Sequence, residues 1–406
     1  MKTRSLILVA AILATGSLVG CSGHGASTAQ HVSSAKLKMD AIKAATQWQT
    51  SHQAFLAGDL NKALKHVNIA LELNPSVTKS HVLRGRILME QGELEEAGLA
   101  FNNAVAIDPN AVDPQYFLGV LHERFAQKDK ALAFYTKAVE LDPENPQYAI
   151  AAAEMMMDLD RMLEAKDFLT QRLNTFEHNA GVRQTLGHIA MIEKDYDKAA
   201  DFFEIARMLS PDDYGIQEDL ARAQVQTQDY AGAETTLARL MSNDAFKERR
   251  DLKLLQATCL IKTDRPVQAR DILFTLTNDH VGSADAEAWI ALGNACYLVN
   301  DLSNLRSAAN RVVALAPRRA EGYLLRGLHA RETKDFPNAE RAVRQALAIE
   351  QTADAFMLLG MIYQDSGKDR LAQASFEKAQ QIAASDSSTT NGTITNASDA
   401  ADLPTE

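Results

Sequence analysis

The chain has 406 residues, of which 46% are hydrophobic and 23% charged, and its formal net charge at pH 7 is −11. This acidic balance argues against nucleic acid or an anionic lipid surface as the main partner, because both are themselves negatively charged. The chain has three cysteines, too few for a disulfide framework to hold a fold of this length.

Residues 1–20 have the composition of a secretory signal. Lys2 and Arg4 form a charged start, an apolar run covers Leu6–Leu13, and small residues lead to Cys21. The run is shorter than the ~20 apolar residues that a spanning helix needs, so a cleaved signal peptide is predicted. Its removal would take away two positive charges and no acid, which changes the net charge from −11 to −13.

The four residues Leu18–Cys21, LVGC, resemble the bacterial lipobox. The resemblance implies that the Cys21 thiol is acylated and becomes the mature N-terminus. Each buried acyl CH₂ contributes about 0.8 kcal/mol, so several chains would anchor the protein to a bilayer. Ser22 resembles the sorting pattern for the outer membrane, facing the periplasm, in Gram-negative lipoproteins. The alternative is an ordinary signal peptide that is cleaved elsewhere.

Residues 21–35 are small and polar and are expected to form a flexible tether from Cys21 to the folded part. His24 and His31 lie in this stretch. Two isolated histidines do not supply the four ligands of a structural zinc site, so no metal site is predicted here.

A 34-residue pattern begins to repeat after the tether. In Thr78–Ala111, two short amphipathic helices are expected at about Lys79–Gln91 and Leu94–Ile107, with a break at Gly92 and an end at Pro109. The second helix carries a small residue that recurs ten times between residues 36 and 384. These residues are Ala63, Ala97, Ala131, Ala165, Ala199, Ala233, Ala269, Leu305, Ala339 and Ala372.

This period of helix pairs resembles the tetratricopeptide repeat (TPR). The resemblance implies an all-α fold, a right-handed TPR superhelical solenoid of about ten helix-turn-helix repeats over residues 36–384. The first helix of each repeat also has a small residue, which we expect at the closest approach of the two helices. These residues are Ser51, Gly85, Gly119, Ala153, Gly187, Ala221, Ala257, Gly293, Gly327 and Gly360.

Some repeats depart from the pattern. In repeat four, Arg172 and Glu177 replace a small residue and the closing proline, yet the register continues, so a weak repeat within one continuous domain is predicted. Two extra residues near Met241–Arg250 and near Asn278–Ala286 indicate longer turns or hinges. The polar, acidic tail 385–406 is expected to be disordered.

The sequence has no pattern typical of a catalytic or cofactor site: HExxH, GxSxG, a glycine-rich phosphate loop and CxxC are all missing. Cys259 and Cys296 fall on first helices and are expected to be buried, unreactive thiols. We therefore predict no enzyme activity, no metal and no cofactor.

The resemblance implies that positions 2, 5, 9 and 12 of each first helix line a concave wall. Positions 5, 9 and 12 of the first four repeats hold Trp48, His52, Phe55, Val82, Arg86, Met89, Tyr116, Val120, Glu123, Ile150, Glu154 and Met157. This apolar, aromatic set predicts a groove for a peptide or helix, unless several members face the core instead. The lysine and asparagine with which some TPRs grip a C-terminal carboxylate are missing, and Asn294 is a lone asparagine at an inward position.

Two functions remain open. The first is a non-catalytic scaffold or adaptor, lipid-anchored in the bacterial cell envelope, that aids assembly of a machine. It resembles the TPR lipoproteins of pilus assembly, secretion or polysaccharide export. The second is a non-catalytic regulatory subunit or recruiter for an envelope enzyme, such as a glycosyltransferase or peptidoglycan hydrolase. In both, the partners are proteins or peptides in the groove and a membrane through the lipid.

Overall fold

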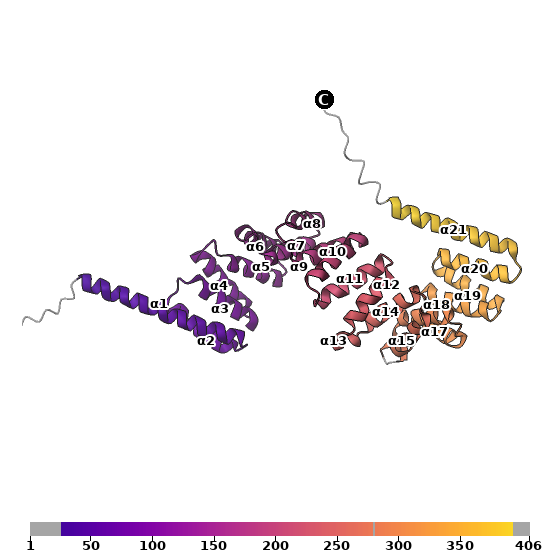
Figure 1. Cartoon of the computed structure of the whole chain (residues 1–406), viewed down its shortest axis with the longest axis horizontal. Helices are drawn as coiled ribbons and strands as arrows, with labels where there is room; N and C mark the ends of the chain where they lie inside the picture. The colour runs from indigo at the N-terminus through magenta and orange to yellow at the C-terminus, as the bar shows by residue number, and fades with distance from the viewer. Residues whose placement is uncertain (1–25, 279–280, 393–406) are drawn as a thin grey trace, which may run out of the picture. The chain divides into compact units, whose positions relative to one another are not determined.

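The computed structural model describes residues 26–278 and 281–392, and every regular element in these ranges is a helix. The chain forms two compact units, residues 1–175 and 176–406. In each unit the helices follow one another as antiparallel pairs (Figure 1). Within each unit, successive helices of the repeats pack on one another, which is how a helical repeat buries its apolar faces.

The first unit contains eight helices within its described residues. They are α1 (Ala26–Leu56), α2 (Leu60–Leu73), α3 (Thr78–Gln91), α4 (Leu94–Ile107), α5 (Val112–Arg124), α6 (Lys128–Leu141), α7 (Pro146–Asp158) and α8 (Met162–Thr170). The bounds of α3 and α4 agree with the sequence prediction to within one residue.

The second unit continues the pattern from repeat five onward. Its helices are α9 (Ala180–Ile192), α10 (Tyr196–Leu209), α11 (Tyr214–Gln226), α12 (Tyr230–Leu240), α13 (Asp244–Lys247), α14 (Arg250–Lys262), α15 (Pro266–Asn278), η1 (Gly282–Ala284), α16 (Ala286–Leu298), α17 (Leu302–Leu315), α18 (Ala320–Glu332), α19 (Phe336–Ile349), α20 (Ala353–Asp365) and α21 (Asp369–Gly392). The short helices α13 and η1 accommodate the two-residue insertions, and α12 packs on α14 past the short α13.

The prediction of one continuous domain differs from the structure, because the two units meet in sequence between Thr175 and Phe176. Helix α8 has nine residues, whereas the helix pairs around it have 13 or 14 residues per helix, and residues 171–178 form turns. Arg172 lies where the pattern has a small residue. Its guanidinium lies 3.7 Å from the Phe168 ring centroid and donates to the Phe168 carbonyl, so a long side chain occupies the place of the small residue.

The two ends of the array also differ from the prediction. Residues 26–35, predicted as a tether, belong to α1, and residues 385–392, predicted as disordered tail, belong to α21. Neither stretch contains proline, and the one glycine in them, Gly392, is the last residue of α21. Extending an existing helix through these residues therefore costs little free energy. The signal peptide, Cys21, residues 22–25 and residues 393–406 lie outside the described residues.

The turn between the two helices of each repeat contains one residue with positive φ. There are ten such residues in the part of the chain that the structure describes, and three are glycine: Gly58, Gly92 and Gly367. The others are Ala126, Asp160, Lys194, Gln228, Asp264, Asn300 and Lys334, with φ between 55° and 65°. A left-handed conformation costs a residue with a Cβ roughly 1–2 kcal/mol and is tolerated better by Asn and Asp, so helix packing rather than local preference holds Ala126, Lys194, Gln228 and Lys334 in it.

The small residue of the first helix faces a side chain of the second helix 16 residues later. A Cβ added to Gly85, Gly187 or Gly360 would lie 2.4–2.5 Å from a ring carbon of Phe101, Phe203 or Phe376. The sequence predicted that the small residues of the two helices would face each other. In these repeats the glycine of the first helix instead makes room mainly for the aromatic ring of the second helix. In repeat one the Ser51 hydroxyl instead donates to the carbonyl of Ala63, at 2.7 Å.

The sizes of the two residues vary together along the chain. Where the later residue is aromatic, the earlier one is glycine, as in Gly119 and Tyr135. Where the later residue is leucine, the earlier one is alanine. These pairs are Ala153 and Leu169, Ala221 and Leu237, and Ala257 and Leu273, and all six side chains are buried. In these seven repeats a nearly constant volume is thus shared between the two helices, whereas in repeats eight and nine the glycine is paired with Ala309 and Val343.

Candidate functional site

The concave positions of repeats one and two form an aromatic cluster with basic side chains on it. The Trp48 and His52 rings stack at 5.1 Å, and the ammonium of Lys79 lies 4.4 Å from the Trp48 ring. Trp48 Nε1 donates to the Lys79 carbonyl at 3.2 Å. Arg86 lies 5.0 Å from the Phe55 ring. These half-buried rings bind cations of their own chain, which covers part of the predicted groove.

Two of the predicted groove residues belong to the core. Val82 is 7% exposed and Met89 is 6% exposed, and both pack in a cluster with Phe101 and Leu118. For Val82 and Met89, the interpretation as groove residues is therefore corrected. The next first helix covers their side chains, which is the alternative that the sequence left open.

Tyr116 lies at the centre of an aromatic group in repeats three and four. Its ring centroid is 5.6 Å from that of Tyr135 and 5.1 Å from that of Tyr148, and its hydroxyl accepts a hydrogen bond from Gln147 Nε2 at 3.0 Å. Burial, assisted by the carboxylates of Glu123 and Glu154, raises the pKa of Tyr116. The Tyr116 hydroxyl is therefore a neutral hydrogen-bonding group at physiological pH.

The remaining predicted positions are mixed. Glu123 is exposed and accepts a 2.5 Å hydrogen bond from the Tyr135 hydroxyl, whose pKa is raised chiefly by burial. Val120 packs half-buried against the core of repeats two and three. Ile150 and Met157 are half-buried and Glu154 is exposed. The wall of the first unit is thus partly groove and partly core.

The same helix positions form a hollow surface in the second unit, which the sequence interpretation missed. One pocket of about 440 Å³ lies on α14 and α16, with Leu254, Thr258 and Ile261 facing Asn294. Another, of about 420 Å³, lies on α16, α18 and α20. We call the second one the C-terminal groove, and its lining includes Ile290, Asn294, Tyr297, Leu324, Leu328, Met357 and Met361.

The C-terminal groove is lined by positions 5 and 9 of its three first helices and by position 12 of repeat eight, Tyr297. Met357 and Met361 are 39% and 36% exposed, unlike Met89 in the first unit. Asn294, the lone inward asparagine, is exposed and lines both pockets. Applying positions 5, 9 and 12 to repeats eight to ten, which follow at 34 and then 33 residues, would have found these residues.

One edge of the C-terminal groove is acidic. Position 2 of repeats eight, nine and ten is Glu287, Glu321 and Asp354, and the last two line the groove. Arg319 forms ion pairs with both Glu287 and Glu321, so one cation is shared between two carboxylates. Asp354 has no ion-pair partner among the residues that the structure describes. The edge therefore carries an excess of negative charge.

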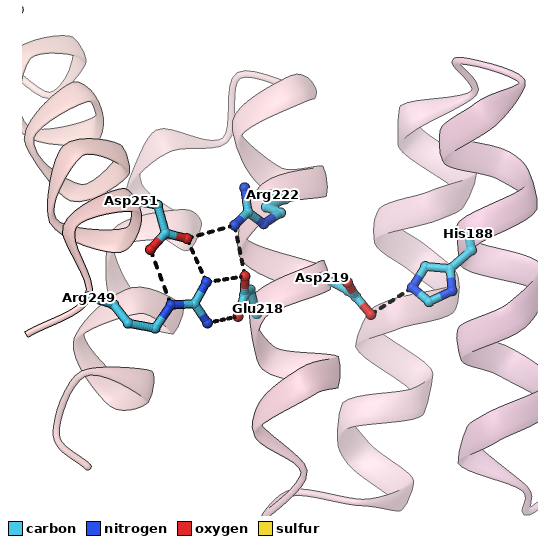
Figure 2. Close-up of polar contacts among 6 residues, drawn as sticks. All are labelled: His188, Glu218, Asp219, Arg222, Arg249 and Asp251. Atoms are coloured by element: carbon cyan, nitrogen blue, oxygen red, sulfur yellow. Dashed lines mark hydrogen bonds and ion pairs between the residues drawn. The ribbon is translucent and has the colours of Figure 1, made fainter. Parts of the chain in front are cut away.

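Charged side chains occupy the concave positions of repeat six and the start of α14 in repeat seven. Figure 2 shows Glu218 bridged by Arg222 and Arg249, and both arginines reaching Asp251. Arg249 lowers the pKa of Glu218 and of Asp251, so the four groups remain ionised and satisfied within the cluster. This charged cluster joins α11 to the start of α14.

A second polar contact lies on the neighbouring repeat. His188 Nε2 is 2.8 Å from Asp219 Oδ2 (Figure 2). Gln184 Nε2 donates to the same oxygen at 2.8 Å. With the charged cluster, these contacts give the repeats before α14 a polar wall. The apolar wall begins at α14.

No metal-binding group of three or more His, Cys, Asp or Glu side chains occurs within residues 26–278 and 281–392. None of the described helices is long and apolar enough to cross a membrane. Cys259 and Cys296 are buried free thiols, as predicted, and burial raises their pKa values to about 11 and about 12.

Helix pairs with this period and this glycine–aromatic contact define a helical repeat protein. Models of the tetratricopeptide repeat match residues 85–124, 112–145, 190–249 and 353–386. The helix pairs are therefore tetratricopeptide repeats, and the chain has the fold of a protein–protein interaction scaffold.

Curated relatives share the repeats over part of their length. Anaphase-promoting complex subunit 3 of Schizosaccharomyces pombe is 22% identical over 156 residues, which is 38% of this chain and 24% of that protein. Protein O-mannosyl-transferase TMTC3 of Homo sapiens is 22% identical over 284 residues, 69% of this chain and 27% of that protein. The chain thus spans about a quarter of the length of these relatives.

Similar solved structures are also repeat proteins. A tetratricopeptide repeat protein from Parabacteroides merdae is 16% identical, covers 63% of this chain and 99% of its own, and gives a TM-score of 0.44. PilF of Pseudomonas aeruginosa is 18% identical, covers 50% of this chain and 92% of its own, and also gives 0.44.

Proposed function

We propose that this chain is a non-catalytic scaffold, anchored by lipid at Cys21 in the bacterial cell envelope, that holds a partner protein in the C-terminal groove. The observation that carries the groove is the exposure of Met357 and Met361 on the apolar wall of three successive repeats. Exposed methionines adapt to varied apolar side chains, and apolar patches of this kind mark binding surfaces. The anchor rests on the lipobox resemblance alone.

The acidic edge defines the chemistry of the partner segment. Glu287, Glu321 and Asp354 outnumber Arg319, so a segment that places Lys or Arg beside its apolar side chains complements the groove. Asn294 offers an amide that can pair with a peptide backbone. The occupant we propose is therefore an amphipathic peptide segment with basic residues along one edge. The array would present it to an assembly of pilus, secretion or polysaccharide-export type.

The test of the groove uses photocrosslinking and matched variants. A photoreactive residue at position 294, in the groove lining, should capture one main partner, and adding Met357→Glu with Met361→Glu should abolish capture. Met208 is 60% exposed on the second helix α10, away from the groove, so Met208→Glu is the matched control. Equal loss of capture in both variants would disprove the groove. A captured glycosyltransferase or peptidoglycan hydrolase would instead identify the chain as the recruiter of an enzyme.

The anchor is tested separately by Cys21→Ser. Without the acylated thiol, the protein should leave the membrane fraction and be recovered as soluble protein or uncleaved precursor. Mass spectrometry of the wild-type N-terminal peptide should find acyl chains on Cys21. A Cys21→Ser variant that fractionates like the wild type would disprove the anchor, and the groove would be unaffected by that result.

A further inference from the structure

A polar pocket of about 350 Å³ lies in the second unit between α17, α18 and α19. It shares no lining residue with the C-terminal groove. Three arginines line it: Arg306 from α17, Arg326 from α18 and Arg341 from α19. The chain as a whole is acidic, so three converging guanidinium groups require an explanation.

The arginines of this pocket are not neutralised by the protein. Among the residues that the structure describes, neither Arg306 nor Arg341 has an acidic partner within ion-pair distance. Arg326 Nε donates to a neutral group, Asn310 Oδ1, at 3.1 Å. Arg249 and Arg319, in contrast, are each held by two carboxylates.

The pocket has one acid in its lining, Asp335, and that carboxylate is engaged at the start of α19. It accepts from the backbone N–H of Asn338 at 3.3 Å and from its side-chain amide at 2.6 Å. As the N-cap of a 14-residue helix, it balances the positive end of that helix rather than the arginines. The lining therefore has a surplus of two positive charges.

His329 lies close enough to Arg306 to be affected by the positive charge of that arginine. Its imidazole lines the pocket, and its pKa is lowered by burial and then by the charge of Arg306. A neutral imidazole beside the guanidinium groups has one N–H that can donate a hydrogen bond to an oxyanion or to an ester oxygen.

We propose that this pocket binds a small phosphate ester, whose phosphoryl group is held by Arg306, Arg326 and Arg341. The planar guanidinium fork matches the oxygens of a phosphate. A phosphoryl group carries nearly two negative charges, which would balance the two surplus positive charges of the lining. A pocket of about 350 Å³ has room for the phosphoryl group and a small organic part. The array thereby gains a ligand site outside its protein-binding wall.

The probes are inorganic phosphate and glycerol 2-phosphate, titrated into the full chain at constant ionic strength and followed by calorimetry. The His329 imidazole resonances, assigned with a His329→Gln variant, should shift on addition of either probe. Arg306→Gln with Arg341→Gln should weaken binding about tenfold or more, as expected for the loss of charge-assisted hydrogen bonds. Arg306→Lys with Arg341→Lys keeps the charge without the fork and should weaken binding less.

The matched control is Arg239→Gln with Arg370→Gln, which removes the same charge from two exposed arginines outside the pocket. Unchanged binding in this control, with loss in the pocket variant, supports the proposal. Equal loss in the two variants, or no shift of the His329 resonances in the wild type, overturns it. Tighter binding of a hexaglutamate peptide than of glycerol 2-phosphate would also overturn it, because the site would then select carboxylates.

Discussion

Gly119 lies directly beneath the ring of Tyr135, because a Cβ on Gly119 would be 2.5 Å from both Cδ1 and Cε1 of that ring. Both residues are buried, and Tyr135 is 1% exposed. The ring cannot rotate away without losing the hydrogen bond from its hydroxyl to Glu123. The absence of one methyl group therefore sets the distance between α5 and α6.

Gly119→Ala should accordingly destabilise the first unit by about 1–3 kcal/mol through overpacking. The matched compensation is Gly119→Ala with Tyr135→Leu, which recreates the alanine–leucine pairing of repeats four, six and seven. The double variant should be more stable than the sum of the two single effects, and a double-mutant cycle in urea measures the difference. Strict additivity would show that the two residues do not share a volume.

Ala126 has φ of +55° in the turn between α5 and α6. Glycine adopts this conformation without a Cβ clash, so Ala126→Gly should stabilise the first unit by about 0.5–1 kcal/mol. Ala133 is an exposed alanine in the interior of α6, and Ala133→Gly should destabilise by a similar amount. The melting temperatures of the two variants should shift in opposite directions. A shift in the same direction would contradict the positive φ of Ala126.

Met89 and Tyr116 were predicted as groove residues together, but the structure separates them. Met89→Ala should destabilise the first unit by about 2–5 kcal/mol, because a core side chain is removed. Met39 is 53% exposed on α1, so Met39→Ala is the control and should change little. Tyr116→Phe should lower the free energy of unfolding by about 0.5–1.5 kcal/mol, the contribution of the hydrogen bond from Gln147. A neutral Met89→Ala would return Met89 to the groove.

The charged cluster around Glu218 predicts a dependence of stability on acid. Arg249 lowers the folded-state pKa of Glu218 below its ordinary value of 4.5. Its contribution is complete above pH 4.5 and is lost as the pH falls through the lowered folded-state pKa. The cluster is partly solvated, so each pair should contribute about 0.2–1 kcal/mol. Glu218→Gln should therefore melt earlier than the wild type at pH 7, and the difference should shrink below pH 4.

Much of the repeat architecture could be predicted from the sequence, because the 34-residue period fixes which residues face each other. The bounds of α3 and α4 followed from Gly92 and Pro109. The left-handed turns without glycine, such as Lys194, could not be predicted, because helix packing rather than local preference holds them. The sequence marked repeat four as weak through Arg172 and Glu177, but it did not predict that α8 would end at Thr170.

The candidate site was harder to predict than the fold. Met89, at position 12, and the methionines of α20, at positions 5 and 9, all fall on the predicted inward face, yet Met89 is core and the other two are exposed. That difference depends on how closely the next first helix approaches, which no single repeat encodes. The pocket of three arginines was missed for a similar reason. Its residues come from three helices and have no common spacing.

The shared volume within each repeat determines what can be exchanged between repeats. If α5 replaced α11 as a single helix, Gly119 would face Leu237 and leave a void; the reverse transplant would press Ala221 into Tyr135. The hairpin of two helices, moved as one piece, carries its own complementary pair and avoids both faults. Recombination or engineered shuffling of this array should therefore succeed at boundaries between hairpins and fail at cuts within them.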